Sequence, residues 1–344
     1  MTIKKILMTG NRGYIGRIMT DALLNRGYDV VGIDSEYFGE NDFAKSMELR
    51  SPKTQMRADF RNLTKFEGVD AVIHLAGLPN DWACDLNPRM ADEINNRAAV
   101  SLATRAKEAG VKRFIFASSC SVFGANGDEL IDENSIPAPI TPYGTSKQHA
   151  EEGLFKLNDD AFTVVCMRNA TCYGVSPRMR FDMVLNNLVA YAFTEGKVKV
   201  LSDGTSWRPI VHIYDVSMAF IKALEAEKEI VSGNVFAVGG QNYKVSEIAQ
   251  IAKDAVPGSE IEFNPNGQKD FRSYNVSFKK IERVLGFKCK WTAAEGAKEL
   301  KDAYIEYDLN KESFQERLFW AGKQLKYLME NKKVDENLYM KEDA

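Results

Sequence analysis

Tyr143 and Lys147 stand one helical turn apart and form the most reactive pair in the sequence. The segment Thr141-Pro142-Tyr143-Gly144-Thr145-Ser146-Lys147 begins as a helix should, because Thr141 can cap it and Pro142 suits its first turn. Both side chains then share one helix face. A phenol has an ordinary pKa of about 10, and a neighbouring ammonium favours its ionised form. This pair could remove a hydroxyl proton while a hydride leaves the same carbon.

A third candidate, Ser119, follows the strand predicted at Arg113–Ser118, in the run Ala-Ser-Ser-Cys-Ser-Val-Phe-Gly that starts at Ala117. Parallel sheets bind ligands outside the carboxyl ends of their strands. Ser119 could therefore hydrogen-bond the oxygen whose proton Tyr143 takes. The three candidate catalytic residues are Ser119, Tyr143 and Lys147.

A glycine-rich turn follows the strand predicted at Lys5–Thr9. Gly10, Gly13 and Gly16 permit a tight turn and a close approach of backbone to a pyrophosphate, and the following helix offers its N-terminal N–H groups. Asp34 ends the next predicted strand, where a carboxylate can accept hydrogen bonds from both ribose hydroxyls of a dinucleotide. Asp34 would repel a 2′-phosphate, and no basic residue follows it until Lys45, which favours NAD over NADP.

The elements that must position these residues alternate between strand and helix. Apolar runs rich in β-branched residues predict strands, and stretches with helical spacing between them predict helices. We expect an α/β fold with a Rossmann-type doubly wound parallel sheet and helices on both faces. The predicted strands are Lys5–Thr9, Asp29–Asp34, Ala71–Leu75, Arg113–Ser118 and Thr163–Met167, and the predicted helices are Tyr14–Asn25, Met90–Ala109 and Tyr143–Leu157.

After residue 175 the pattern changes to Arg-, Pro- and Gly-bearing loops, which indicates a smaller C-terminal α/β substrate lobe. We expect an NAD-binding domain at 1–175, with 207–237 returning to it, and a substrate-binding lobe with a C-terminal helix at 176–206 and 238–344. Elements expected in that lobe are a strand at Val198–Leu201, helices at Phe181–Thr194, Ser246–Asp254 and Ala293–Tyr307, and one amphipathic packing helix at Lys311–Lys333.

Size and composition exclude several classes of protein. At roughly 150 residues per domain, 344 residues allow two domains or one two-lobed domain. The chain is 44% hydrophobic and 27% charged, and its net charge of -3 argues against a general nucleic-acid or membrane-surface binder. No apolar run is long enough to span a membrane, and we expect no signal peptide. The five cysteines show no CxxC pair, so a reducing cytoplasm and no metal are expected.

Together these motifs make the chain resemble an extended short-chain dehydrogenase/reductase of the NAD-dependent nucleotide-sugar epimerase/dehydratase family, in particular its UDP-galactose 4-epimerase-like members. The resemblance runs from residue 1 to at least 310. It rests on GNRGYIG at 10–16, Asp34, AD at 58–59, VIHLAG at 72–77, SSCSVFG at 118–124, YGTSK at 143–147, RNATCYG at 168–174, NNL at 186–188, WRPIVHIYDV at 207–216 and DFRSY at 270–274.

The resemblance implies a role for each matching position. Ser119, Tyr143 and Lys147 become the catalytic triad, with Lys147 lowering the pKa of Tyr143. Cofactor-binding residues are Gly10, Gly13, Tyr14, Ile15, Gly16, Asp34, Asp59, Phe60, Leu75, Ala76 and Gly77, with Asp59 and Phe60 at the adenine. Asn187, Arg208 and Arg272 would hold a nucleotide diphosphate, and Asn80, Cys120 and Thr171 are further candidate substrate contacts.

The implied function is NAD-dependent 4-epimerisation of a nucleotide-diphosphate sugar by transient oxidation at C4. A 4-dehydrogenase or 4-keto reductase is the alternative. Cys120 and Ser121 replace the Asp-Glu pair of the family's 4,6-dehydratases, which disfavours dehydration, and epimerisation at a carbon acid through Cys120 stays open. A non-catalytic NAD-sensing scaffold is the hypothesis from another class.

Other polar residues are interpreted as structural. His74 and His212 are expected to be buried and satisfied, and Arg178 and Arg180 to lie on the surface without a role. The family resemblance also implies a homodimer, formed by the helices Met90–Ala109 and Tyr143–Leu157.

Overall fold

Seven parallel strands form the central sheet of the computed structural model, which describes residues 3–39 and 43–341. Their order is β11-β7-β5-β4-β1-β2-β3, so the predicted Rossmann-type doubly wound sheet is confirmed. The strands are β1 Lys5–Thr9, β2 Asp29–Asp34, β3 Thr54–Arg57, β4 Ala71–His74, β5 Arg113–Ser119, β7 Thr163–Asn169 and β11 Asn234–Val238.

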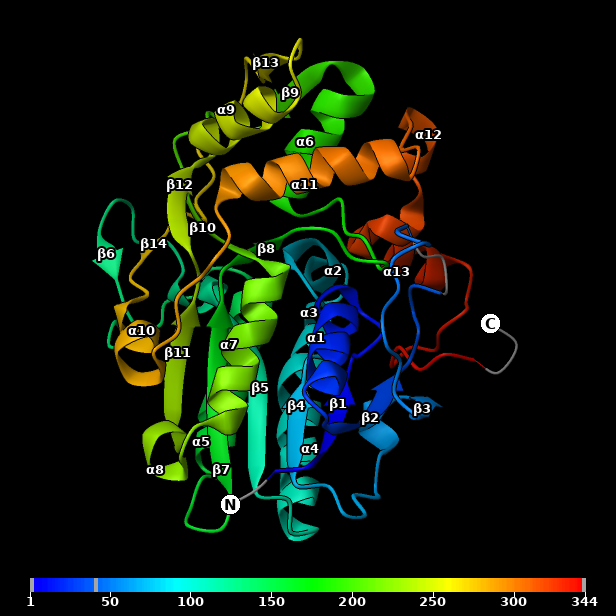
Figure 1. Ribbon diagram of the computed structural model, residues 1–344, viewed down its shortest axis with the longest axis vertical. Coiled ribbons are helices and arrows are strands. Elements are labelled where there is room, and N and C mark those ends of the chain that lie inside the picture. The colour runs from blue at the N-terminus through cyan, green and yellow to red at the C-terminus, as the bar shows by residue number, and fades with distance from the viewer. Residues whose placement is uncertain (1–2, 40–42, 342–344) are drawn as a thin grey trace.

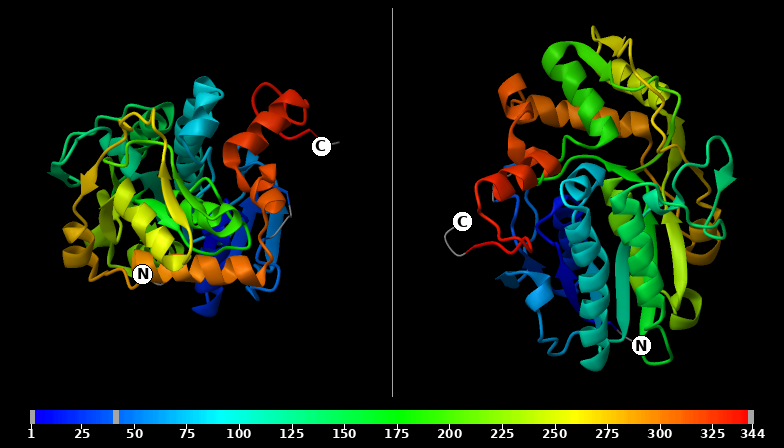
Figure 2. Two further views of the ribbon diagram at one scale, coloured as in Figure 1. Left: turned by 90° about the horizontal axis from the view of Figure 1, so that it is seen from above. Right: turned by 180° about the vertical axis from the view of Figure 1, so that it is seen from behind.

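Helices cover both faces of this sheet (Figures 1 and 2). On one face lie α1 Tyr14–Asn25 and α7 Ile213–Glu225, and on the other lie α4 Ala98–Glu108 and α5 Pro142–Phe155. Every residue of β4, β5 and β7 is buried, because helices exclude water from both sides of the strands. This is why those strands are continuous apolar runs in the sequence.

The helix predicted at Met90–Ala109 is interrupted. The chain forms α3 at Pro88–Asp92, a π-helical turn at Glu93–Arg97 and then α4. The wider turn directs Asn95 inward, where its Oδ1 accepts from the Leu78 N–H at 2.8 Å and its Nδ2 donates to Ser146 Oγ at 3.2 Å. Such turns are frequent at functional sites, and this one joins the loop after β4 to helix α5.

A smaller lobe caps the carboxyl edge of the sheet, at the top of Figure 1. It contains a three-stranded sheet in the order β12-β10-β8 and two pairs of short strands, β13 with β9 and β14 with β6. Its strands are β6 Leu130–Ile131, β8 Thr171–Tyr173, β9 Lys197–Val200, β10 Trp207–His212, β12 Gln241–Lys244, β13 Glu260–Phe263 and β14 Asn275–Val276, and its main helices are α6 Val184–Glu195, α9 Val245–Ala255, α10 Lys279–Leu285 and α11 Ala293–Glu306.

The single helix predicted at Lys311–Lys333 is wrong. The chain turns twice and forms α12 at Lys311–Phe314, a 3-10 turn at Arg317–Phe319 and α13 at Ala321–Glu330. The breaks let Phe314 and Phe319 both pack on Phe181, with ring centres 5.2 Å and 5.5 Å apart. Residues 321–341, called the C-terminal segment here, then run beside α2 Asp81–Asp85 and strands β2 and β3 (Figure 1).

Two further observations bear on the predictions from composition. No helix within residues 3–39 and 43–341 is long and apolar enough to span a membrane. All five cysteine thiols are free, and all but Cys289 are fully buried.

Candidate active site

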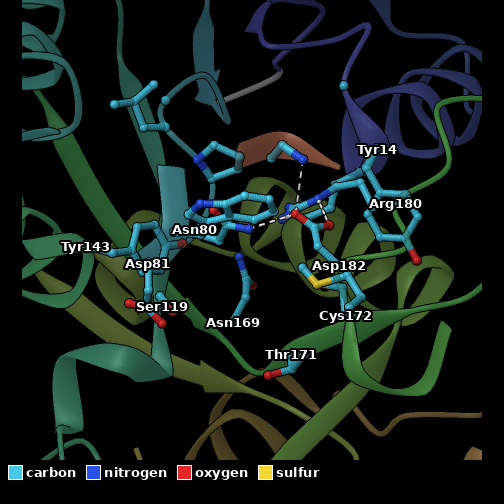
Figure 3. Close-up of a pocket in the computed structure, with 18 of the residues that line it drawn as sticks. Tyr14, Asn80, Asp81, Ser119, Tyr143, Asn169, Thr171, Cys172, Arg180 and Asp182 are labelled. Carbon is cyan, nitrogen blue, oxygen red and sulfur yellow. Dashed lines mark hydrogen bonds and ion pairs between the residues drawn. The ribbon is translucent and has the colours of Figure 1, made fainter. Parts of the chain in front are cut away.

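One cavity of about 720 Å³ follows the carboxyl edge of the sheet, between the two lobes. It extends from the glycine-rich turn after β1 to the arginines of the smaller lobe, and Figure 3 shows its central part. The predicted site residues that line it are Gly10, Gly13, Tyr14, Ile15, Gly16, Asp34, Asp59, Phe60, Leu75, Ala76, Gly77, Asn80, Ser119, Tyr143, Lys147, Thr171, Asn187, Arg208 and Arg272.

The glycine-rich turn is crowded by backbone. A Cβ on Gly10 would lie 2.8 Å from the Ala76 nitrogen, and Gly10 has a φ of +73°. A Cβ on Gly16 would lie 2.2 Å from the Gly10 carbonyl oxygen. Only glycine fits these two positions, so the start of α1 can approach a ligand phosphate closely.

Asp34 is fixed at the end of β2. Its two carboxylate oxygens accept from the backbone N–H groups of Arg12, at 3.0 Å, and Glu36, at 2.8 Å. Burial raises the pKa of Asp34 despite these two bonds. Each carboxylate oxygen keeps a further lone pair, which gives an oriented acceptor for ribose hydroxyls.

The two predicted adenine contacts, Phe60 and Asp59, have different surroundings. Phe60 is buried against His74, with ring centres 4.8 Å apart. Asp59 lines the cavity, but its carboxylate is held by Arg61, whose Nε and Nη2 donate to its two oxygens at 2.9 Å and 2.6 Å. Arg61 in turn donates to the backbone carbonyl of Asn337 at 2.6 Å, so the C-terminal segment is tied to this end of the cavity.

Ser119, Tyr143 and Lys147 meet at the carboxyl end of β5. Thr141 caps α5 as predicted, accepting from the Gly144 N–H at 3.1 Å, and Tyr143 and Ser119 both line the cavity. The Lys147 ammonium donates to the Ala117 carbonyl oxygen at 2.8 Å and lies 5.9 Å from the centre of the Tyr143 ring.

The electrostatics of this pair differ from the expectation that lysine lowers the tyrosine pKa. Burial raises the pKa of Tyr143, and the nearby Ser119 hydroxyl only partly offsets this effect. Burial lowers the pKa of Lys147 to about 8. The protein by itself therefore favours the neutral phenol at pH 7, because burial penalises the charged form.

A buried ion pair fixes the catalytic helix to the sheet. Glu151 of α5 accepts from Arg168 of β7 at 2.7 Å and from the Ser118 hydroxyl of β5 at 2.5 Å. Because Ser118 precedes Ser119 and Glu151 lies one turn beyond Lys147, these bonds set the position of Tyr143 and Lys147 relative to Ser119.

Arg180 is a cavity residue that the sequence analysis wrongly assigned to the surface. Its side chain is 12% exposed, and its Nε and Nη2 donate to Asp182 at 2.9 Å and 3.0 Å. Asn80 donates to the same carboxylate at 2.7 Å, as the dashed lines of Figure 3 show. Arg178 is also buried and lines the cavity. Asp182, the acidic partner of Arg180, lies two residues after it and was the available signal.

The two arginines predicted to hold a diphosphate are already joined by carboxylates. Arg208 and Arg272 both donate to Asp270, and Arg272 donates to Asp81 at 2.8 Å. Asp81 belongs to α2, so this ion pair connects the two sides of the cavity mouth. The other Asp81 oxygen is buried without a hydrogen-bond partner. Asp81 was not among the site residues predicted from the sequence, and its role at the mouth was missed.

Cys120 is the predicted site residue that the structure removes from the cavity. The chain turns into a 3-10 helix at Cys120–Phe123, and the Cys120 thiol points to the Arg168 carbonyl oxygen, 3.3 Å away. His74 and His212 are buried, as expected, but the prediction that both are satisfied is wrong for His74, whose Nε2 has no hydrogen-bond partner within the described residues. His74 is 2.6 Å from the Thr9 hydroxyl, and His212 Nε2 is 2.9 Å from Glu299.

A parallel sheet with a glycine-rich crevice, an acidic residue after its second strand and a Ser-Tyr-Lys group defines a dinucleotide-dependent oxidoreductase-type site. The model of the NAD dependent epimerase/dehydratase family matches residues 6–239. The chain therefore belongs to this family and is an enzyme of its NAD-dependent type.

Relatives and solved structures agree with this assignment. The UDP-glucose 4-epimerase of Erwinia amylovora is 27% identical, over 86% of this chain and 95% of the relative. That of Bacillus subtilis (strain 168) is 28% identical, over 86% and 94%. The UDP-glucuronic acid 4-epimerase of Bacillus cereus, solved with UDP-glucuronic acid and NAD, superposes with a TM-score of 0.76 at 26% identity, over 88% of this chain and 99% of that one.

Proposed function

We propose that this protein is an NAD-dependent nucleotide-sugar 4-epimerase. The observation that carries the proposal is the continuity of one cavity, which joins the Gly10–Gly16 turn to Ser119 and Tyr143 and then to Arg208 and Arg272. A dinucleotide and a nucleotide sugar laid end to end in it would meet beside Tyr143. The 4-epimerase relatives, which align over nearly their whole length, support the same reaction.

The residues at one end of the cavity fit NAD. The Gly10–Gly16 turn would hold the pyrophosphate and Asp34 the adenosine ribose. Asp34 and Glu36 place two carboxylates at this end, and Arg12, 2.5 Å from Glu36, is committed to that carboxylate, which disfavours a 2′-phosphate. When bound, NAD would accept a hydride from C4 of the sugar and return it to the opposite face.

Tyr143 is the proposed base and acid. It takes the C4 hydroxyl proton as the sugar is oxidised and returns that proton to the oxygen as the sugar is reduced. Ser119 hydrogen-bonds the same sugar oxygen. The phenol needs further positive charge to ionise at neutral pH, because burial raises its pKa. Lys147 would supply part of that charge, beside the nicotinamide cation of a bound NAD.

The smaller lobe is proposed to hold the nucleotide diphosphate. Arg208 and Arg272 can each offer two parallel N–H donors to phosphate oxygens once they leave their carboxylate partners. Asn187, which lines the same part of the cavity, is a further contact. A clamped diphosphate would let the oxidised sugar turn over without escaping, which inversion at C4 requires.

The test is turnover with NAD and UDP-glucose, followed by separation of the products. We expect a product inverted at C4 with no net formation of NADH. Stoichiometric NADH would instead identify a 4-dehydrogenase or 4-keto reductase.

A matched variant tests the role of the phenol. Tyr143→Phe should lower turnover by about 10²–10⁴-fold while NAD still binds, because it removes only the group that moves the proton. Unchanged turnover in this variant would contradict the mechanism. Binding of NAD without any turnover in the native protein would favour the NAD-sensing scaffold. Cys120 is buried outside the cavity, which disfavours epimerisation at a carbon acid through its thiol.

We also propose a cytoplasmic homodimer that pairs the α3–α4 stretch and α5 of each subunit. The outer face of these helices is polar, with Asp92 lying 3.1 Å from Arg97 and 3.3 Å from His149. Sedimentation should therefore give a dimer at micromolar concentration that weakens with salt. A monomer at that concentration would contradict the proposal.

A further inference from the structure

Asn169 is a polar residue of the cavity to which the proposed mechanism gives no role. It ends β7, and in the parallel register of β5 and β7 it lies directly beside Ser119. Paired residues of neighbouring strands leave the sheet on the same face, so the two side chains are neighbours. Asn169 is 8% exposed and lines the cavity between Ser119 and Thr171 (Figure 3).

The side-chain amide of Asn169 uses little of its capacity for hydrogen bonds. Its Nδ2 donates to the Ser118 carbonyl oxygen over a long distance, 3.4 Å. Its Oδ1 is buried and has no hydrogen-bond partner among residues 3–39 and 43–341. The amide cannot be reversed, because a carbonyl oxygen only accepts and Nδ2 must therefore face Ser118. Native proteins keep few buried acceptors unpaired, so Oδ1 calls for a donor from a ligand.

The place of Asn169 favours the dinucleotide over the sugar as the source of that donor. Asn169 belongs to the central sheet, and a dinucleotide that runs from the Gly10–Gly16 turn to Tyr143 lies along the carboxyl ends of its strands. The nucleotide sugar would instead enter from Arg208 and Arg272, on the smaller lobe. The reactive end of the dinucleotide is therefore the part that comes nearest to the end of β7.

The nicotinamide end of NAD carries a matching group. Its primary carboxamide has an NH2 that donates hydrogen bonds, and Oδ1 of Asn169 is a free acceptor. The next backbone N–H along the chain, that of Ala170, already donates to the Val238 carbonyl at 2.8 Å. At this strand end the side chain of Asn169 is thus better placed for a ligand than the backbone that follows it.

We propose that Asn169 is a cofactor-binding residue: its Oδ1 accepts a hydrogen bond from the carboxamide NH2 of nicotinamide. The carboxamide is attached to the ring carbon next to the one that carries the hydride. Holding it would therefore fix how the reactive carbon faces Ser119 and Tyr143. The inference needs only the NAD dependence of the family, so it goes beyond the proposed function and does not depend on 4-epimerisation.

The test is a competition between NAD and ADP-ribose, which lacks the nicotinamide. Each protein is equilibrated with an excess of both ligands at equal concentration, and the ratio bound is measured after denaturation and separation. Asn169→Leu should lower the ratio of bound NAD to bound ADP-ribose about 3- to 10-fold, the loss expected for one hydrogen bond. Asn234→Leu, at the amino end of β11 and outside the cavity, is the matched control and should leave the ratio unchanged.

An analogue of NAD tests the same bond from the ligand side. The acetylpyridine analogue has a methyl group in place of the carboxamide NH2 and keeps the carbonyl. The native protein should prefer NAD to this analogue, and Asn169→Leu should reduce that preference by a similar factor, about 3- to 10-fold, because the acceptor is gone. Asn169→Ala is the second variant and should shift both ratios in the same direction, and thermal unfolding with ADP-ribose bound shows that each variant is folded.

An unchanged ratio of NAD to ADP-ribose in both Asn169 variants would overturn the proposal, and so would a preference for NAD over the analogue that the variants retain. Weaker binding of UDP-glucose with both ratios unchanged would assign the residue to the sugar instead. Neither competition requires turnover. A native protein that binds NAD but epimerises no sugar would therefore contradict the proposed function and leave this inference to the two ratios.

Discussion

At the scale of single residues, burial shifts the pKa values of the groups in the site that can carry charge. Lys147 is 5% exposed, and burial lowers its pKa to about 8. The proposed function accounts for this cost, because it requires the ammonium beside the bound cofactor. Functional sites commonly hold such destabilising groups.

Replacing Lys147 with methionine should therefore stabilise the fold and destroy activity. Below pH 8 the lysine is charged in both folded and unfolded states, so the full cost is present there, and it disappears as pH rises from 8 toward 10.5. Lys147→Met should raise the free energy of unfolding by about 1–3 kcal/mol at pH 7. This gain is smaller than the pKa shift alone implies, because the hydrogen bond to the Ala117 carbonyl is lost. Urea unfolding at pH 7 and pH 10 measures this, and lower stability at pH 7 would contradict it.

At the scale of elements, the sequence predicted most accurately those helix and strand ends that a local signal marks. The ends of β1, α1 and β2 agree with the prediction, because a buried apolar run, a glycine turn and a terminal aspartate mark them. The sequence does not mark the π-helical turn at Glu93–Arg97, which forms because Asn95 bonds the distant Leu78 and Ser146. The breaks after Phe314 and Phe319 likewise depend on Phe181, far away in the chain.

Most of the candidate site was predictable for a related reason. The glycine turn, Asp34, Ser119 and Tyr143 lie at strand ends or at a helix start, which sequence spacing locates. Arg180 was missed because its place in the cavity depends on Asn80, a residue of the larger lobe that donates to the same Asp182 carboxylate. Sequence spacing carries no information about such pairings.

The turn between β1 and α1 should not accept any side chain at Gly16. A methyl group there would lie 2.2 Å from a backbone oxygen, and neither backbone can yield without moving β1 or α1. Gly16→Ala should lower the free energy of unfolding by at least about 2 kcal/mol and abolish binding of NAD. Gly240→Ala, whose Cβ would meet nothing closer than 3.5 Å, is the control and should change stability by less than about 1 kcal/mol. Calorimetric titration with NAD and thermal unfolding measure both effects, and normal binding by Gly16→Ala would contradict the assignment of the turn.

At the scale of the whole molecule, the two sides of the cavity mouth are joined by Asp81 and Arg272. Arg208 and Arg272 face Asp270 and Asp81, so the charges at the mouth balance before a diphosphate arrives. An incoming diphosphate must therefore compete with Asp81 for Arg272. The exchange is feasible because Arg272 is 46% exposed.

Asp81→Asn should strengthen binding of UDP, since it removes the competing carboxylate and keeps the shape. We expect a gain of about 3- to 10-fold, measured by calorimetric titration at low salt, that shrinks as salt screens the site. Asp85→Asn removes a charge one helical turn away that interacts with Arg272 without a hydrogen bond, and it should change the affinity by less than Asp81→Asn does. Weaker binding of UDP by Asp81→Asn would show that the carboxylate assists the ligand.

The contacts that hold residues 321–341 against the cavity have a consequence for how the protein binds its dinucleotide. Tyr37 and Arg61 line the adenosine end of the cavity, and both donate to the Leu338 carbonyl, while the Arg61 guanidinium lies 3.6 Å from the centre of the Tyr339 ring. The dinucleotide could leave past Tyr37 and Arg61 only if their contacts with residues 338 and 339 broke. A chain ending at Glu330 should then be purified without NAD and should exchange added NAD within seconds, whereas the full chain should be purified with NAD bound. Equal NAD occupancy in the two preparations would show that these contacts only stabilise the fold.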